Sequence, residues 1–320
     1  MYYFRMKKKN HKIPVAILGS GNIGSDLLIK ILRSPHLTCT LFAGKNPDSP
    51  GLARAAALGI PVSSESIQGI IANEKKYDIV FDATSAEAHK VHAVVLKRLK
   101  KFTIDMTPSR VGMMCVPVLN VDRAIRQPNV SMISCGGQAT APLVHAILDV
   151  HPDTQYVELI SSIASKSAGI GTRDNIDEYT ETTCDALIEL GTAPKAKAIV
   201  ILNPAEPPIM MHNTVYATIL NPKIEKLKKK IEEMEKKIQQ YVPGYHITVG
   251  PIVENGRVTV MNEVTGQGDF LPVYAGNLDI INCAAVAVAE KWAFNKKSKV
   301  ESRKSKVESR KPKVEMRGER

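Results

Sequence analysis

Short apolar runs alternate with amphipathic stretches through the first half of the chain. Compact apolar runs predict buried strands, and apolar residues spaced three or four apart predict helices. The strands are expected at residues 15–20, 37–44, 77–84, 102–107 and 130–135. The helices are expected at residues 23–34, 51–59, 86–100 and 141–150. Strands that alternate with helices in this way indicate a parallel sheet with helices on both faces.

The second half has longer alternating segments, which predict strands of a mixed sheet at residues 155–165, 197–204 and 214–220. A hairpin is expected at 246–264, with its turn at Asn255-Gly256. Helices are expected at residues 175–191, 222–242 and 277–294. The helix at 222–242 carries one apolar stripe among many charges, which favours a helix covering one face of a sheet over a coiled coil.

Together these patterns predict an α/β fold with two domains. A Rossmann-type domain built on the parallel sheet is expected to span residues 1–134 and to be completed by the helix at 276–295. An α+β domain with the mixed sheet is expected at residues 135–275. A chain of 320 residues is long enough for two domains with a large core.

The net charge of +11 would suggest nucleic-acid binding if it were spread over the fold. The ends at 1–12 and 296–320 carry +5 and +7 of it, so the body between them is nearly neutral and no specific nucleic-acid partner is expected. The C-terminal end repeats the sequence SKVESRK at 298–304 and 305–311, and we expect residues 296–320 to be disordered.

The sequence has no apolar stretch long enough to span a bilayer and no signal-peptide pattern, so a cytoplasmic protein without membrane association is expected. Its cysteines are odd in number and scattered, without a CxxC pair. Neither a disulfide framework nor a metal site is therefore expected. Four of them are expected to pack in the core: Cys39, Cys115, Cys184 and Cys283.

A GxGxxG motif follows the first predicted strand and opens the first predicted helix. Its first glycine permits a tight turn, its second lets the backbone approach a pyrophosphate, and its third lets helix and strand pack closely. The helix N-terminus then offers free N–H groups to the phosphates. The motif predicts dinucleotide binding by Gly19, Ser20, Gly21, Asn22, Ile23 and Gly24.

The sequence favours NAD as the cofactor and leaves NADP open. An NAD site usually has an acid at the end of the second strand, but this position reads Ala43-Gly44-Lys45. Asp48 comes late for that role, while Lys45 and Arg54 are compatible with a 2′-phosphate.

Cys135 lies between a predicted strand and a predicted helix, directly before Gly136 and Gly137. A thiol at a helix N-terminus is expected to have a lowered pKa, which favours the nucleophilic thiolate. The two glycines leave room for a substrate, and their N–H groups are candidates to stabilise an oxyanion. A thiolate beside a nicotinamide suggests aldehyde oxidation through a thiohemiacetal and a thioester, with water, phosphate or coenzyme A as the final acceptor.

Several motifs, in matching order over roughly residues 13–293, resemble those of the CoA-acylating acetaldehyde dehydrogenases of meta-cleavage pathways for aromatic hydrocarbons catabolism. They include GSGNIGSDLLIKILRS, SCGGQATAP, SKSAGIGTRDNIDEYTETT and LPVYAGNLDI. The resemblance implies a glyceraldehyde-3-phosphate dehydrogenase-like architecture. It also implies the reaction of acetaldehyde, NAD⁺ and CoA to acetyl-CoA and NADH through an acyl-cysteine.

The resemblance further assigns residues and partners. It implies Cys135 as the nucleophile, Asn277 as a cofactor contact, and a homodimer in complex with 4-hydroxy-2-oxovalerate aldolase. A second cofactor-contacting segment is implied at Ser167, Ala168, Gly169, Ile170, Gly171, Thr172, Arg173, Asp174 and Asn175. From its residue type alone, Asn277 is equally suited to capping the last helix.

The chain departs from the family pattern at His212-Asn213, where many relatives have Arg-Asp. The acid is a candidate base or orienting group for the thiol, and an amide cannot take a proton, so His212 is a possible substitute. The segment between YVPGY and LPVYAG also looks shorter than in relatives, and a change there could alter dimer or aldolase contacts.

Two alternatives remain open from the sequence. One is a phosphate-dependent or semialdehyde dehydrogenase that uses a cysteine, although SCGGQAT differs from the usual cysteine motifs of those enzymes. The other is a catalytically decayed NAD-binding subunit of an aldolase complex.

Overall fold

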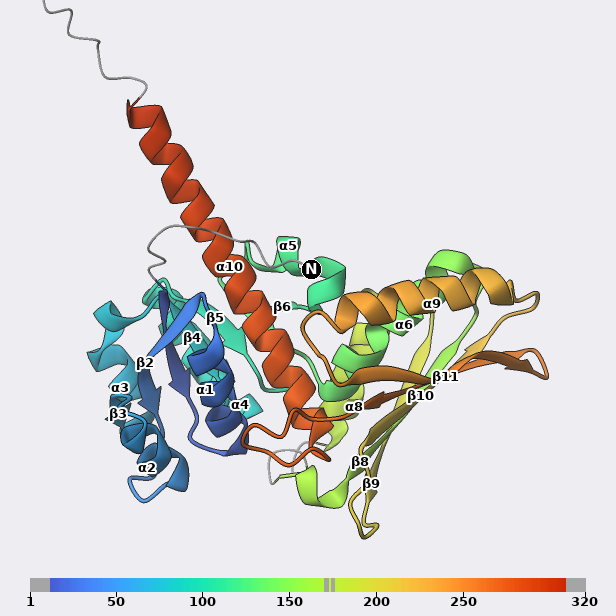
Figure 1. The fold of residues 1–320 in the computed structure, drawn as a ribbon, viewed down its shortest axis with the longest axis horizontal. Helices are drawn as coiled ribbons and strands as arrows, with labels where there is room; N and C mark the ends of the chain where they lie inside the picture. Colours follow the sequence, from blue (N-terminus) through green and yellow to red (C-terminus); the bar gives the residue numbers. More distant parts are fainter. Residues whose placement is uncertain (1–11, 170–172, 174–175, 309–320) are drawn as a thin grey trace, which may run out of the picture.

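The computed structural model describes residues 12–169, 173 and 176–308. Figure 1 shows a parallel sheet at the left, a second sheet at the right and one long helix running between them. In the described part of the chain, no helix is both long and apolar enough to cross a membrane.

The first sheet is entirely parallel, with strand order β3-β2-β1-β4-β5-β7-β6. Its central strands consist almost wholly of buried residues, as expected for a sheet covered on both faces. The strand order reverses between β1 and β4, and ligands of such sheets bind at that point. The strands are β1 Ile13–Leu18, β2 Leu37–Ala43, β3 Val62–Ser63, β4 Ile79–Asp82, β5 Phe102–Asp105, β6 Met113–Met114 and β7 Asn129–Ser131.

Helices connect these strands and cover the sheet. In α4, Ser85 caps the first turn by accepting a hydrogen bond from the Ala88 N–H. The helices are α1 Asn22–Arg33, α2 Pro50–Ala57, α3 Ser66–Ala72, α4 Ala86–Arg98 and α5 Pro117–Ala124, with a 3₁₀ turn η1 at Glu74–Lys76. The expected parallel sheet of alternating strands and helices is therefore confirmed.

The second sheet has the order β11-β12-β10-β8-β9 and is mixed, because β8 and β9 are parallel while the other pairs are antiparallel. The expected hairpin joins β11 to β12, and Asn255 and Gly256 both have positive φ, as a tight two-residue turn requires. The strands are β8 Val157–Ala164, β9 Ala196–Asn203, β10 Met211–Thr218, β11 Tyr245–Glu254 and β12 Arg257–Val264.

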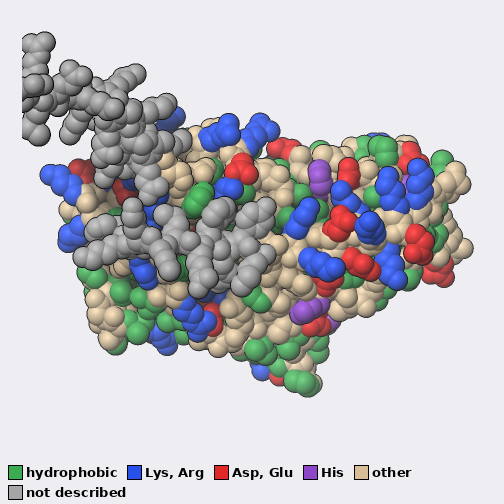
Figure 2. Space-filling view, turned by 45° about the horizontal axis from the view of Figure 1, so that its top comes forward, with side chains coloured by type: hydrophobic (Ala, Val, Ile, Leu, Met, Phe, Trp, Pro, Cys, Tyr) green, Lys and Arg blue, Asp and Glu red, His purple; other side chains and the backbone are tan. Residues whose placement is uncertain are grey.

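Helices α6, α8 and α9 cover one face of the second sheet, and α9 lies across its top in Figure 1. Their bounds are α6 Cys135–Val150, α8 Ile176–Glu189 and α9 Ile224–Ile238, and a 3₁₀ turn η2 spans Ser165–Ser167. The apolar stripe of α9 is buried at Leu227, Ile231, Met234 and Ile238, which confirms its predicted role. Over α9, at the right of Figure 2, basic and acidic side chains are interleaved rather than gathered by sign.

Helix α10, Gly276–Glu308, runs between the two halves and packs against α1, α5 and α6. Its Trp292 stacks on Phe102 of β5, with ring centroids 5.2 Å apart. The expectation that disorder begins at residue 296 is wrong up to Glu308, because the helix continues. Residues 277–308 contain neither Gly nor Pro, so a helix already held by packing can propagate along them. The rest of the repeat, 309–320, lies outside the described residues.

Candidate active site

A cavity of about 520 Å³ lies at the carboxyl ends of the parallel strands, where the strand order reverses. It brings together three features that lie far apart in the sequence: the glycine loop, Cys135 and the start of α10. Its lining residues are Gly21, Asn22, Ile23, Ala83, Thr84, Ser85, Ala86, Met106, Thr107, Pro108, Ile133, Ser134, Cys135, Gly169, Tyr179, Asn277, Leu278 and Ile281.

The local structure explains the three glycines of the loop in three different ways. Gly19 has φ +121°, and a Cβ there would lie 2.4 Å from the Ala83 carbonyl oxygen. A Cβ on Gly24 would lie 1.9 Å from the Gly19 oxygen, so α1 and β1 can approach only without it. Gly21 has open space around its would-be Cβ, on the side where a ligand can approach. These are the features that a bound pyrophosphate requires.

Ser20, the second residue of the glycine loop, is held in place by a hydrogen bond to its side-chain hydroxyl. The Ser49 Oγ, at the start of α2, donates to the Ser20 Oγ at 2.8 Å. This bond ties the glycine loop to the segment after β2, where a ribose would lie. Arg54 stacks on Phe270, with its guanidinium carbon 4.1 Å from the ring centroid, whereas Lys45 is exposed.

Asn277 contributes an unpaired polar atom to the cavity. The residue is buried, and its Oδ1 has no hydrogen-bond partner among the described residues. A buried unpaired acceptor is costly unless a ligand satisfies it. A carboxamide N–H such as that of nicotinamide fits this acceptor, and together with the open space at Gly21 the residues present fit a dinucleotide.

The second implied cofactor segment is only partly described. Gly169 lines the cavity. Ser167 donates to the Ala164 carbonyl, and Arg173 donates to the carbonyls of Ala168 and Ser165, so these side chains are engaged locally. The remaining members, Ile170, Gly171, Thr172, Asp174 and Asn175, lie outside the described residues.

Cys135 is the first residue of α6 and follows a strained turn after β7. Ile133 has φ +66°, which is unfavourable for a β-branched residue and is typical of functional turns. Ser134 then caps the helix by accepting a hydrogen bond from the Gly137 N–H at 3.0 Å. The turn thereby presents the Cys135 sulfur to the cavity.

The expectation of a lowered thiol pKa is wrong, because Cys135 is buried. Burial raises the pKa of Cys135 to about 11, although hydrogen bonds from Tyr179 and the Gly136 N–H oppose this shift. Only 8% of the residue is exposed, so the desolvation of the thiolate outweighs the helix N-terminus.

The N–H groups expected to stabilise an oxyanion are already engaged. The Gly136 N–H donates to the Tyr179 phenol oxygen at 3.1 Å, and the Gly137 N–H donates to Ser134. The Tyr179 oxygen also lies 3.4 Å from the Cys135 Sγ. Sequence reasoning missed Tyr179. The only available signal was a tyrosine on the inward stripe of a helix, where its hydroxyl needs a partner.

His212 and Asn213 are neighbours in β10, so their side chains point to opposite faces of the sheet. His212 is half-exposed on the open face, with its Nε2 3.5 Å from the Glu263 carboxylate. Asn213 is buried on the face covered by α6, where its Oδ1 accepts a hydrogen bond from Ser161. Only Asn213 therefore lies on the same side of the sheet as Cys135.

The remaining cysteines are free. Cys39, Cys115 and Cys283 are buried in the hydrophobic core, as expected, and Cys184 is half-buried. Burial raises the pKa of Cys115 and Cys283 far above the ordinary range.

A buried ionic network lies beneath the cavity. The Asp82 Oδ2 lies 2.9 Å from His89 Nδ1 and 2.8 Å from His92 Nδ1. The Oδ1 of the same carboxylate accepts a hydrogen bond from the Thr84 N–H. Burial alone would raise the pKa of Asp82, but the two histidines outweigh it and lower the pKa to about 2. The network thus holds the loop after β4, which lines the cavity.

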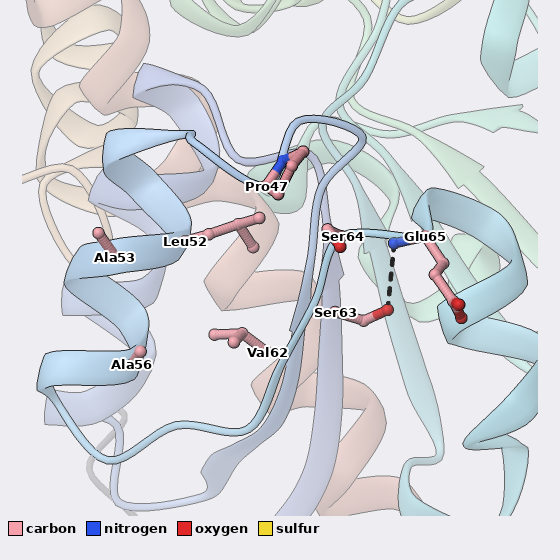
Figure 3. A pocket seen from close by; sticks show the side chains of 8 residues that line it. All are labelled: Pro47, Leu52, Ala53, Ala56, Val62, Ser63, Ser64 and Glu65. Atoms are coloured by element: carbon pink, nitrogen blue, oxygen red, sulfur yellow. Dashed lines mark hydrogen bonds between the residues drawn. The ribbon is translucent and has the colours of Figure 1, made fainter.

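A second cavity of about 450 Å³ opens between α2 and β3. Figure 3 shows Leu52, Ala53 and Ala56 of α2 on one side and Val62 with the Ser63–Glu65 segment on the other, where the Glu65 N–H donates to the Ser63 Oγ. Its lining residues are Pro47, Leu52, Ala53, Ala56, Val62, Ser63, Ser64 and Glu65. This lining includes no thiol or imidazole, so the cavity at Cys135 is the candidate active site.

Comparison with known proteins identifies the family of the chain. A family model described as "Prokaryotic acetaldehyde dehydrogenase, dimerisation" matches residues 135–272. Acetaldehyde dehydrogenase of Spirochaeta aurantia is 51% identical over 281 residues, covering 88% of this chain and 95% of that protein. Acetaldehyde dehydrogenase of Geobacillus stearothermophilus is 52% identical over 287 residues, covering 89% and 97%.

Among solved structures, aspartate semialdehyde dehydrogenase II from Vibrio cholerae matches with a TM-score of 0.60 and 14% identity. The match covers 87% of this chain and 97% of that one. At this identity it supports the shared fold alone, which is the predicted architecture. The relatives at about half identity over nearly their whole length decide the family: the chain belongs to the acetaldehyde dehydrogenases.

Proposed function

We propose that the protein oxidises acetaldehyde to acetyl-CoA, with NAD⁺ as the oxidant and coenzyme A as the acyl acceptor. The observation that carries this proposal is that the Cys135 thiol and the open face of the glycine loop line one cavity. A nucleophile next to a dinucleotide site suits aldehyde oxidation through a covalent intermediate.

In the proposed reaction, the Cys135 thiolate forms a bond to the aldehyde carbon as the C=O π bond breaks, and the oxygen takes a proton from water to give a thiohemiacetal. The bound nicotinamide supplies the hydride acceptor, so that the thiohemiacetal is oxidised to a thioester as its hydroxyl proton leaves to water. The thiol of coenzyme A then attacks the thioester carbonyl, acetyl-CoA leaves, and Cys135 regains a thiol.

The protein residues would prepare these steps in separate ways. Gly21 gives the pyrophosphate access to the N-terminus of α1, and Asn277 Oδ1 accepts a hydrogen bond from the carboxamide. Because Cys135 has a raised pKa without ligands, we infer that the positive charge of bound NAD⁺ favours its thiolate.

NAD⁺ is the proposed cofactor, and NADP⁺ is its compatible alternative. The segment after β2 has no acid at the usual position for a ribose 2′-hydroxyl, and Lys45 is exposed there. A comparison of the KM for NAD⁺ and NADP⁺ in wild type and Lys45→Glu tests this choice. A 2′-phosphate contact predicts that the substitution raises the KM for NADP⁺ selectively.

We further propose that the protein forms a homodimer and associates with 4-hydroxy-2-oxovalerate aldolase in the cytoplasm. The match to a dimerisation model supports the first part, and the sequence resemblance supports the second. Five free cysteines are typical of a reducing compartment. Co-purification with the aldolase, and with a matched unrelated aldolase as control, tests the association.

The activity is tested by NADH formation from acetaldehyde and NAD⁺, with and without coenzyme A. Wild type is expected to turn over only with coenzyme A, and Cys135→Ser to lose turnover. Cys39→Ser is the matched control, because that thiol is buried on β2 and is not among the residues that line the cavity. If wild type binds NAD⁺ but forms no NADH with short aldehydes, the enzyme assignment fails and a binding subunit is favoured.

A further inference from the structure

The phenol of Tyr179, on α8, contacts the two groups of α6 that matter most for the proposed chemistry. Its oxygen lies 3.4 Å from the Cys135 Sγ and accepts a hydrogen bond from the Gly136 N–H. The approach is close, because a Cβ on Gly136 would lie 2.5 Å from that oxygen. Glycine at 136 therefore makes room for the phenol, and the expectation that Gly136 and Gly137 leave room for a substrate is wrong, because protein side chains fill the space beside both of them.

The direction of the hydrogen bonds between α6 and the second sheet follows from one backbone carbonyl. The Ala139 carbonyl can only accept, so Asn262 must turn its Nδ2 toward it, at 3.0 Å. The Asn262 Oδ1 is then an acceptor and receives the Asn213 Nδ2, at 2.6 Å. The Asn213 Oδ1 therefore accepts the proton of the Ser161 hydroxyl.

The Ser161 hydroxyl is thereby engaged with Asn213. The Tyr179 oxygen already accepts a hydrogen bond from the Gly136 N–H, so its own proton can serve as the donor toward the Cys135 Sγ, 3.4 Å away. A thiolate is a strong acceptor, so the phenol directs its proton to the sulfur when Cys135 ionises.

We propose that Tyr179 is a catalytic residue of this site, whose phenol donates a hydrogen bond to the Cys135 thiolate. The proposal rests on the function proposed above, in which Cys135 is the nucleophile. The thiol proton leaves to water in the cavity, and the phenol keeps its own proton and directs it to the sulfur. No covalent bond to tyrosine forms.

The surroundings of the phenol suit a donor rather than a base. Burial raises the pKa of Tyr179 well above its ordinary value, so it stays protonated. Among the described residues, Cys135 is the titratable group in contact with it. The hydrogen bond received from Gly136 polarises the phenol O–H and strengthens its donation to sulfur.

Tyr179→Phe tests the proposal by removing the hydroxyl and keeping the ring. We would measure iodoacetamide alkylation of Cys135 between pH 7 and pH 10, following the Cys135 peptide by mass spectrometry. The loss of a charge-assisted hydrogen bond should raise the thiol pKa by about one unit, and the alkylation rate at a given pH should fall about three- to fourfold, because the less acidic thiolate is also more nucleophilic.

Tyr77→Phe is the matched control, because it also removes a buried hydroxyl, which donates to Ile70 at 2.7 Å outside the cavity. Its alkylation rate should equal that of wild type. An unchanged rate in Tyr179→Phe, or an equal fall in both variants, overturns the proposal.

A fluorinated tyrosine at position 179 gives a second arm that does not depend on losing a hydrogen bond. It is a stronger donor of similar size, so alkylation of Cys135 should become faster, and a slower or unchanged rate contradicts the proposal. Alkylation needs neither aldehyde nor cofactor. Its failure is therefore distinct from a failure of the acetaldehyde assay.

Discussion

The amide nitrogen of Asn213 lies 2.6 Å from the amide oxygen of Asn262, and both residues are buried. The bond is possible because Asn262 directs its own nitrogen to the Ala139 carbonyl of α6. An amide is the side chain that fits position 213, since it must accept from Ser161 and donate to Asn262 at once. In this chain Asn213 orients the hydrogen bonds behind Cys135 and takes no proton.

Asn213→Asp should therefore destabilise the protein. The new carboxylate would face the Asn262 oxygen, and a buried acceptor would lose its donor, which costs about 1–3 kcal/mol. Urea unfolding at pH 7.5 measures the change. His212→Asn, on the open face of the same strand, should change the free energy of unfolding by less than about 0.5 kcal/mol. An Asn213→Asp protein as stable as wild type would refute the assigned amide orientation.

Two glycine-to-alanine substitutions in the glycine loop should have opposite effects on NAD⁺ binding and on stability. Gly21→Ala should fold with a stability within about 1 kcal/mol of wild type, because its Cβ meets open space, yet bind NAD⁺ at least about tenfold more weakly. Gly24→Ala should lose about 3 kcal/mol, because its Cβ would lie 1.9 Å from the Gly19 oxygen. Calorimetric titration and urea unfolding separate the two, and the same phenotype for both would argue against the described loop.

The Asp82 carboxylate should make the free energy of unfolding depend on pH in the acidic range. Its folded pKa of about 2 lies below the unfolded value, so its stabilising contribution is present above about pH 4 and is lost as the pH falls toward 2. The difference in free energy of unfolding between wild type and Asp82→Asn should shrink by about 1 kcal/mol from pH 5 to pH 3. A difference that stays constant or grows over this range would contradict the His89 and His92 contacts.

The open face of the second sheet should form the dimer contact. It carries apolar side chains such as Ile201, which is 45% exposed, and α6, α8 and α9 cover the opposite face. Ile201→Lys should shift the mass measured by light scattering from two chains toward one. Val91→Lys on α4, whose side chain is also exposed, should leave the mass unchanged. If both variants keep the wild-type mass, this face is not the interface.

The glycine loop and Cys135 could be located from the sequence because local spacing decides them. At both places a strand, a tight turn and a helix must follow one another within a few residues, and the residue types of each motif occur in that order along the sequence. Alternation along β10 could also have separated His212 from Asn213, because neighbours on a strand face opposite sides. The predicted strand starts at residue 214, after both of them, whereas β10 starts at Met211, so the sequence pattern alone assigns neither residue to a face.

The raised pKa of Cys135 and the role of Tyr179 could not be derived in this way. Both depend on how α8 packs on α6, a contact between segments more than 40 residues apart. A helix N-terminus favours a thiolate only while the sulfur is solvated, and the packing that brings Tyr179 to Cys135 also removes water. The continuation of α10 past residue 296 likewise depends on a helix already fixed by the fold.

The most direct test of the account is the mass of the Cys135 peptide after wild type is mixed with acetaldehyde and NAD⁺ without coenzyme A. One acetyl group is expected on Cys135, formed together with NADH and released as acetyl-CoA when coenzyme A is added. Formation of NADH while Cys135 stays unmodified, under conditions that preserve thioesters, would contradict it.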